Sequence, residues 1–150
     1  MALNTDFIGR TYPATEPYLV GREKIREFAR SLGDSNPFYF DVEVALSAGF
    51  NDLIAPPTFA IVVTMGAGEQ VIFDPELGLD YTRVVHGDQK FVHHRVITAG
   101  DQLTCVVVVH DIRSVAGNDM ITIRSEIADS NGEQVTTVYS MILSRGTDSP

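Results

Sequence analysis

The pattern of apolar and polar residues changes character near residue 80, and the part before it is helical. In Arg22–Leu32 the apolar residues recur at the i, i+3, i+4 and i+7 spacing that gives one buried stripe: Ile25, Phe28, Ala29 and Leu32. Gly33 follows directly, as glycine commonly does at the C-terminus of a helix. The sequence therefore predicts a helix over 22–32 with one face on a core.

Two further helices are expected before residue 80. Asp41 is a good N-cap for a short helix that runs through Ala48. A longer helix is expected to begin at Pro56 or Pro57, because proline is tolerated in the first turn. The chain carries almost no charge from there through Gly68, so this helix is expected to be buried on nearly all sides.

After residue 80 the pattern indicates strands. Apolar and polar residues alternate in Ile121–Ile127 and in Val135–Ser144, which is typical of half-buried strands. Two other segments are extended in character, Thr82–Val96 and the valine-rich Gln102–Ser114. Turn residues at 116–118 and 130–133 predict tight hairpins between the later segments. Two short extended segments, Phe7–Tyr12 and Pro17–Val20, precede the helices.

One hydrophobic helix followed by about five antiparallel strands predicts an α+β fold in which a curved sheet wraps around the helix. The segregation of helices from strands excludes a doubly wound parallel sheet. At 150 residues with 44% hydrophobic content, the chain is expected to form a single domain over 1–150 with a substantial core. Only residues 146–150 are expected to form a loose tail.

Composition narrows the class of protein. The net charge is −9 and the 11 basic residues are scattered, so a nucleic-acid-binding surface is not expected. The longest uncharged apolar run, 54–68, is shorter than the roughly 20 residues of a membrane-spanning helix. The first residues lack the pattern of a secretory signal, and the single Cys105 in a valine-rich strand is expected to be a buried small hydrophobe. We therefore expect a cytoplasmic protein.

The segment Leu32–Phe59 contains the most distinctive candidate chemistry. Asp34 follows the first helix, and general acid/base catalysis usually needs such a carboxylate paired with a histidine or a second carboxylate. Five residues later the chain has Tyr39, whose phenol has an ordinary pKa of about 10 and is a poor base at neutral pH. Two interpretations stay open for each residue: Asp34 takes part in catalysis or holds turn amides, and Tyr39 bonds a substrate or packs.

Three histidines lie in the predicted strand over 82–96. Strict alternation would place His86 and His94 on one face and His93 on the other. Eight residues of extended chain separate His86 from His94 by roughly 26 Å, so no metal site is expected, and nothing in the sequence indicates a cofactor. His86 and Gln89 are either polar groups facing a substrate or ordinary solvated or core residues.

The segment Leu32–Phe59 resembles the hydratase motif of the hot-dog-fold MaoC-like family, the (R)-specific enoyl-thioester hydratases and 3-hydroxyacyl-thioester dehydratases. That motif runs G-D-x-N-P-L-H-x-D-x-x-x-A-x-x-x-G-F, and it is matched in register by Gly33, Asp34, Asn36, Pro37, Asp41, Ala45, Gly49 and Phe50, with Ile54 beyond. His86–Arg95 and Ala99–Asp101 resemble the H-G-x-Q-x-F-x-x-H-R and A-G-D segments of the family's N-terminal, dehydratase-like branch. The resemblance covers nearly the whole chain and implies a hot-dog fold.

The chain departs from the family at the residues that the resemblance makes most important. The resemblance implies an Asp/His pair that moves water on or off a thioester-conjugated double bond. Here Tyr39 stands in place of the histidine, and Pro56-Pro57 stands in place of a later His-Gly. Losing one positioned acid/base group typically lowers a rate by about 10² to 10⁴. An isolated homodimer is therefore expected to be weak or inactive.

Some heterodimeric (3R)-hydroxyacyl-carrier-protein dehydratases pair a catalytic hot-dog subunit with one that lacks the histidine and shapes the acyl channel. This chain resembles the second kind. The resemblance implies an acyl-CoA or acyl-carrier-protein thioester as ligand and a hot-dog partner subunit. Asp34 and Tyr39 would line a degenerate site, and the expected substrate-side residues are Asn36, Pro57, Thr58, Phe59, His86 and Gln89.

Two alternatives remain open. One is a self-sufficient homodimeric hydratase that uses Asp34 with Tyr39 or His86. The other is a non-enzymatic module that binds acyl ligands. The amides at the start of the helix after Pro57 could hold a thioester carbonyl. Its small residues at 66–68 would permit close packing or leave room for an acyl chain.

Overall fold

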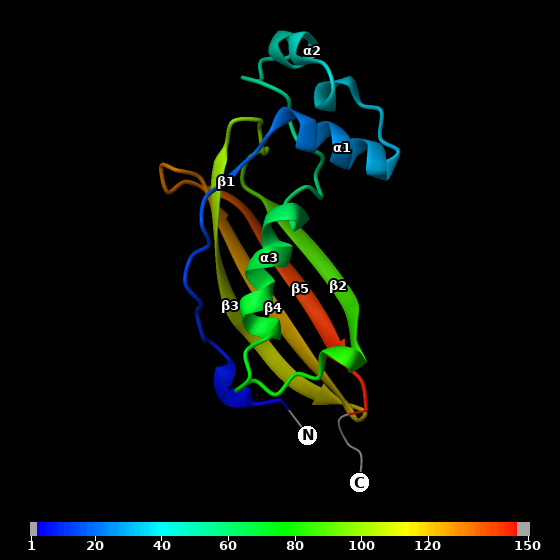
Figure 1. Ribbon diagram of the computed structural model, residues 1–150, viewed down its shortest axis with the longest axis vertical. Coiled ribbons are helices and arrows are strands. Elements are labelled where there is room, and N and C mark those ends of the chain that lie inside the picture. The colour runs from blue at the N-terminus through cyan, green and yellow to red at the C-terminus, as the bar shows by residue number, and fades with distance from the viewer. Residues whose placement is uncertain (1–2, 147–150) are drawn as a thin grey trace.

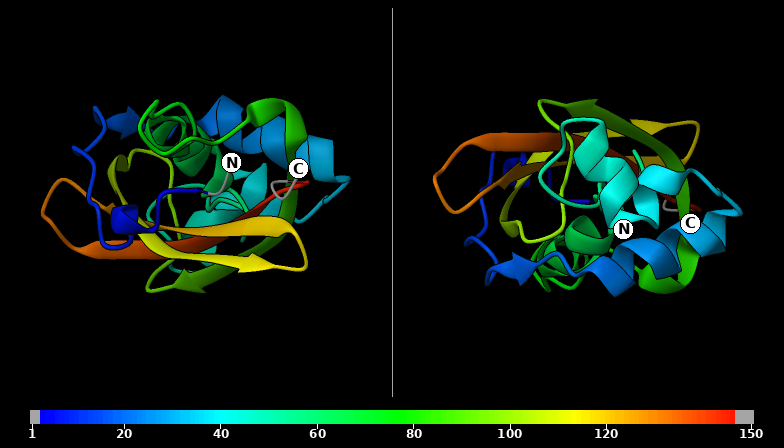
Figure 2. Two further views of the ribbon diagram at one scale, coloured as in Figure 1. Left: turned by 90° about the horizontal axis from the view of Figure 1, so that it is seen from below. Right: turned by 90° about the horizontal axis from the view of Figure 1, so that it is seen from above.

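The computed structural model describes residues 3–146, so all but the first residue of the expected tail at 146–150 lies outside the described chain. It contains one curved antiparallel sheet with strand order β1-β3-β4-β5-β2 and a helix, α3, on its inner face (Figure 1). Seen along the strands, the helices lie on one side of the sheet (Figure 2). The predicted α+β fold, a curved sheet around a hydrophobic helix, is confirmed.

Three long strands form a meander: β3 (Gln102–Val115), β4 (Asn118–Ala128) and β5 (Gln134–Ser144). β2 (Val84–His93) pairs with β5, and the two-residue β1 (Tyr18–Leu19) pairs with β3. The earlier extended segment predicted over 7–12 is wrong in part, because Thr5–Phe7 form a 3₁₀ turn and only Thr11 makes an isolated bridge, to Val108.

The alternation in β4 produces the core as predicted. Ile121, Ile123 and Ile127 are buried on the inner face of the sheet, and α3 buries Ala67 and Val71 in the same cluster. Burial of each isoleucine or valine side chain contributes about 1.5–3 kcal/mol, so this contact between the helix and the sheet stabilises the fold by several kcal/mol.

The first two helices follow the sequence closely. α1 covers Arg22–Leu32, and Gly33 ends it in the left-handed conformation at φ 68°. A 3₁₀ turn at Pro37–Tyr39 leads to α2 (Val42–Ser47), whose first amides donate to the side chain of Asp41. These elements form a small cap over one end of the sheet (Figure 1).

The bounds predicted for the long helix are wrong by about a turn at each end. α3 runs from Ile61 to Ile72, because the residues before it form tighter turns in which Phe59 N–H donates to Pro56 O (2.9 Å). Its predicted all-round burial is also wrong, since Met65 is 69% exposed. A single helix on one sheet leaves its outer side uncovered. Among residues 3–146, no helix has the length and apolarity needed to cross a membrane.

The β3–β4 hairpin is closed by a two-residue turn, Ala116-Gly117, with φ of 52° and 77°. Positive φ at both positions is the requirement of a type I′ turn, which favours Asn-Gly. We expect Ala116→Asn to raise the free energy of unfolding by about 1 kcal/mol, because alanine is strained in this conformation and asparagine is tolerated. Urea unfolding measures this. The matched change Ala14→Asn, in exposed chain without positive φ, should alter stability by less than about 0.5 kcal/mol, and equal effects would contradict the explanation.

Candidate functional site

A β-bulge in β2 determines which of its side chains face the helix. The pairing with β5 shifts register between His86 and Asp88, so one extra residue, Gly87, is inserted. His86 therefore lies on the inner face together with Gln89 and, further along, His93. The prediction that His86 shares a face with His94 is wrong, because a bulge reverses the alternation after it.

A mostly apolar hollow lies between α3 and the strands that α3 covers least, β5 and β2. We call it the helix cavity; its volume is about 310 Å³. α3 lies closest to β3 and β4, and the cavity extends from β4 across β5 to β2. Its walls are Ile61, Thr64, Met65, Gly68 and Ile72 of α3 with His86, Gln89, Ile123, Ser125, Ser140 and Ile142 of the sheet. Both of the strand residues predicted as substrate-side groups, His86 and Gln89, line it.

A small polar area lies on the sheet side of this cavity. His86 Nε2 is 3.0 Å from Ser140 Oγ, and Gln89 is the direct cross-strand partner of Ser140. The Nε2 atom of Gln89 is buried. We call His86, Gln89 and Ser140 the polar spot.

A second hollow, the turn cavity, has a volume of about 210 Å³ and lies beside the cap. Its walls are Tyr39, Ile54, Ala55, Pro56, Pro57, His93, Val96 and Ile97. His93 and Gln89 occupy the same face of β2, so the two cavities follow one another along that strand. Tyr39 and Pro57, both predicted as site residues, meet here.

The turn that carries Asp34 and Tyr39 is held by its own side chains. Asp34 is exposed, and its Oδ1 accepts from the amide of Asn36 (3.0 Å). The Asn36 side chain in turn accepts from the amide of Phe38 (3.1 Å). Asp34 therefore uses one carboxylate oxygen to hold the backbone of its own turn.

Tyr39 is buried, with 6% of its surface exposed. Burial raises the pKa of its phenol above the usual 10, the nearby Asp34 carboxylate raises it further, and a side-chain hydrogen bond with Asn36 acts in the opposite sense. The hydroxyl is consequently protonated at neutral pH. It can donate a hydrogen bond, and it cannot serve as a general base there.

The three residues around the start of α3 have different surroundings. Pro57 and Thr58 are exposed, whereas Phe59 is fully buried and its ring packs edge-to-face on Phe28 with 5.4 Å between centroids. The helix itself starts at Ile61. The first turn of α3 therefore begins after Pro57, Thr58 and Phe59, the residues that the sequence assigned to the substrate side of the site.

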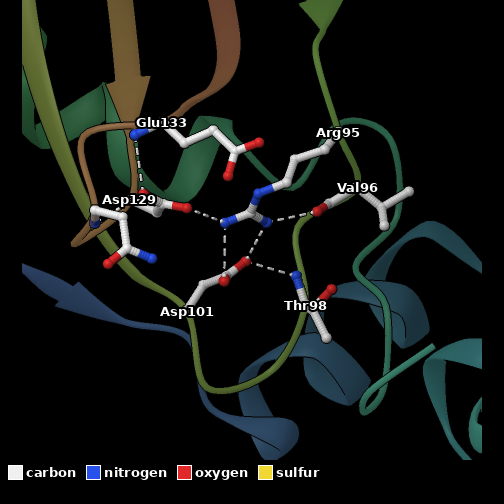
Figure 3. Close-up of polar contacts among 7 residues, drawn as sticks. Arg95, Val96, Thr98, Asp101, Asp129 and Glu133 are labelled. Carbon is white, nitrogen blue, oxygen red and sulfur yellow. Dashed lines mark hydrogen bonds and ion pairs between the residues drawn. The ribbon is translucent and has the colours of Figure 1, made fainter.

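An ion-pair network that sequence reasoning missed fixes the wall of the turn cavity (Figure 3). Arg95 binds both carboxylate oxygens of Asp101 (2.8 and 3.1 Å) and one of Asp129 (3.0 Å). Asp101 also accepts from the amide of Thr98 (2.9 Å). Residues 95–101 are thereby tied to the β4–β5 turn, and this loop supplies two walls of the turn cavity, Val96 and Ile97. In the sequence, Arg95 at the end of the segment His86–Arg95 was the residue that could have indicated this network.

The opposite charges in this network shift the pKa values of its members. Hydrogen bonding to Arg95 holds the pKa of Asp129 below its usual range, and Asp101 raises the pKa of the Arg95 guanidinium. In the described part of the chain, residues 3–146, no three His, Cys, Asp or Glu side chains gather as metal ligands would.

The sheet, the central helix and the two cavities define a hot-dog domain of the MaoC-like dehydratase class. A solved MaoC-like dehydratase superposes with a TM-score of 0.87 and 34% identity over 95% of this chain, which spans 43% of that longer chain. The HadBC complex of Mycobacterium tuberculosis, a (3R)-hydroxyacyl-ACP dehydratase, contains a chain with a TM-score of 0.84 and 31% identity, covering 94% of this chain and 99% of the other.

The sequence comparisons specify the family. Residues 6–138 match the model of the FAS1-like dehydratase domain region. A UPF0336 protein of Streptomyces avermitilis is 52% identical over 148 residues, which are 99% of both chains. The chain belongs to the FAS1-like dehydratase family.

The Arg95 network yields a stability prediction. Arg95→Gln removes four hydrogen bonds of a half-buried guanidinium, three to carboxylates and one to the Val96 carbonyl, so we expect a loss of about 2 kcal/mol in the free energy of unfolding. Arg22→Gln is the matched control, because Arg22 makes a similar two-bonded pair with Asp52 but is 52% exposed. That change should cost less than about 1 kcal/mol, as measured by urea unfolding. Equal losses would show that burial is not the cause.

The stability difference between the wild type and Arg95→Gln is expected to depend on pH. A carboxylate whose folded pKa is lowered stabilises the fold above its unfolded pKa, about 3.9 for aspartate, and this contribution disappears as the pH falls through the folded pKa. The difference in unfolding free energy between wild type and Arg95→Gln should stay constant from about pH 5 to 8 and shrink below about pH 4. A difference that persists unchanged in acid would contradict the role of Asp129.

Proposed function

We propose that this chain is the acyl-thioester-binding subunit of a 3-hydroxyacyl-thioester dehydratase, or enoyl-thioester hydratase, of fatty-acid metabolism. The observation that carries the proposal is the succession of two cavities along one face of β2, the helix cavity at His86 and Gln89 and the turn cavity at His93. A larger apolar cavity next to a smaller one suits an acyl chain that ends in a thioester.

The helix cavity supports binding of the acyl chain. Its apolar walls include Ile61, Ile72 and Ile142, and Gly68 leaves open space where a side chain would stand. Each methylene buried there contributes about 0.8 kcal/mol, so a cavity of this size favours chains of several carbons. The thioester then lies at the turn cavity between Tyr39 and Pro57. Acyl-CoA and acyl-carrier-protein substrates carry the same thioester group, so the proposal includes both.

The chemistry of the turn cavity supports a need for a catalytic partner. Dehydration of a 3-hydroxyacyl thioester requires removal of a proton from C2 and protonation of the departing hydroxyl at C3. Tyr39 stays protonated, Asp34 is not among the residues that line the turn cavity, and His93, which does line it, has no carboxylate beside it on those walls. In the proposed arrangement a partner subunit supplies the acid/base pair, and Tyr39 and Asn36 orient the thioester by hydrogen bonding.

The sheet offers an edge for that partner. β2 ends the strand order, and within residues 3–146 no strand pairs with its outer edge. Its backbone groups there need covering, since an uncovered edge strand is prone to associate. The HadBC relative is itself a complex. We propose a second hot-dog subunit, identical or related, at this edge.

The first experiment measures hydration of crotonyl-CoA and of longer enoyl-CoAs by the chain alone and by the chain co-expressed with a hot-dog subunit that has an intact Asp/His pair. We expect little turnover by the chain alone and an increase of at least about 10² with the partner. Asp34→Asn in this chain should leave the turnover of the complex within a few-fold. If the isolated chain is instead fully active and Asp34→Asn abolishes this activity, the chain is a self-sufficient enzyme.

The second experiment tests the acyl cavity. Gly68→Leu places a side chain in the helix cavity, where a Cβ meets no atom within 4 Å, so the fold should tolerate it. We expect affinity for dodecanoyl-CoA to fall at least about tenfold, the equivalent of burying two fewer methylenes, while affinity for butyryl-CoA is unchanged. Isothermal titration calorimetry measures both.

The matched control is Gly66→Leu. Gly66 lies in the same helix and is exposed, and a Cβ at its position would likewise meet no atom within 4 Å. This change should leave both affinities unaltered. An equal loss in the two variants, or no loss in either, would remove the helix cavity from the proposal.

A further inference from the structure

We infer that His93 binds the carbonyl oxygen of the thioester, so that this oxygen accepts hydrogen bonds from His93 and Tyr39 together. The inference rests on the proposed function and adds a substrate-contacting residue to the turn cavity. His93 was not among the site residues expected from the sequence, and it belongs to neither the Asp34 turn nor the start of α3.

His93 supplies one of the two hydrogen-bonding side chains in the walls of an otherwise apolar cavity. The turn cavity is lined by Tyr39 and His93 together with alanine, isoleucine, proline and valine side chains. Ligand sites typically combine apolar walls with a few polar groups that fix the orientation of the ligand. The two polar residues come from segments far apart in the chain, His93 from the end of β2 and Tyr39 from the 3₁₀ turn of the cap. Only the folded chain brings them to one cavity.

The imidazole of His93 is accessible and has no other partner for its nitrogens. His93 is exposed, and its ring lies parallel to that of Phe91, with 6.1 Å between centroids and 4° between planes. Within residues 3–146 its ring nitrogens make no hydrogen bond. The neighbouring His94 differs, because its Nε2 lies 3.0 Å from Thr137 Oγ1. The His93 imidazole is therefore able to hydrogen-bond to a ligand in the cavity.

The size of the turn cavity points to a single functional group. Its volume, about 210 Å³, is below the roughly 300–1,000 Å³ of sites that enclose a whole drug-sized ligand. The helix cavity, at His86 and Gln89 on the same face of β2, takes the acyl chain in the proposed function. The group that follows the chain is the thioester, whose carbonyl oxygen has two lone pairs. One can accept from the protonated Tyr39 hydroxyl and the other from an N–H of His93.

This oxygen is also the atom on which charge develops in the proposed reaction. When the base of the partner subunit removes the proton from C2, the electron pair of the C–H bond forms the C1–C2 double bond of an enolate. The negative charge moves to the carbonyl oxygen, where hydrogen-bond donors stabilise it. In this arrangement His93 and Tyr39 hold the oxygen while the partner moves the protons.

The experiment compares dodecanoyl-CoA with S-dodecyl-CoA, in which a methylene replaces the carbonyl and the number of carbons is unchanged. The protein is the full chain together with any subunit that co-purifies with it, and isothermal titration calorimetry gives both affinities. We expect the thioester to bind at least about fivefold more tightly than the thioether, which is the effect of one net hydrogen bond.

His93→Phe is the diagnostic variant, because phenylalanine keeps a ring beside Phe91 and removes both nitrogens. It should weaken the binding of dodecanoyl-CoA, leave that of S-dodecyl-CoA unchanged and so at least halve the preference. His94→Phe is the matched control, since His94 is the next residue and lines neither cavity, and it should keep the preference. Melting temperatures of both variants check the fold.

The outcomes separate this inference from the proposed function. Equal affinity of the wild type for the thioester and the thioether would overturn the inference and leave an acyl-binding subunit. A preference that His93→Phe leaves intact, or that His94→Phe lowers equally, would also overturn it, because the effect would not then belong to His93. If neither compound binds, the proposed function fails and this inference fails with it.

Discussion

The packing of one hydrophobic helix against a wider curved sheet is the constraint on which the other features depend. An α-helix with its side chains is about 10–12 Å across, and strands lie about 4.8 Å apart, so one helix covers little more than two strands. α3 lies closest to β3 and β4. β5 and β2 are left partly uncovered on the inner face, and the helix cavity occupies that strip. The fold therefore creates its own candidate acyl site as a consequence of incomplete coverage.

Two local features determine which residues line the cavities beside β5 and β2. The bulge at Gly87 reverses the alternation of β2, so that His86, Gln89 and His93 all face inward along one line. The Arg95 network then fixes the loop after β2, which supplies Val96 and Ile97 to the walls of the cavity that Tyr39 also lines. The bulge determines which side chains of β2 face the cavities, and the Arg95 network fixes one wall of the turn cavity. The first lies in β2, one of the two edge strands, and the second acts on the loop that follows it.

The turn at Asp34–Tyr39 combines side chains that hold its own backbone with a buried phenol. Asp34 and Asn36 use hydrogen-bonding capacity on the local backbone, and burial keeps the Tyr39 phenol protonated. A protonated phenol near a thioester can orient it without moving a proton from carbon. The cavities, the edge of β2 that no strand within residues 3–146 covers, and this turn together support the proposed subunit that holds a substrate for a neighbour.

The sequence by itself determined the helices α1 and α2, the β3–β4–β5 meander and the α+β class, because caps, turn residues and apolar periodicity are local properties of the chain. It also brought Asp34, Tyr39, His86 and Gln89 forward as candidates. Only the tertiary structure decided that Tyr39 and His93 meet in one cavity, that Gln89 and His86 meet in another, and that Phe59 belongs to the core. The bulge in β2 and the partners of Arg95 depend on strands distant in sequence, and pairing between distant segments leaves no periodic mark in the chain.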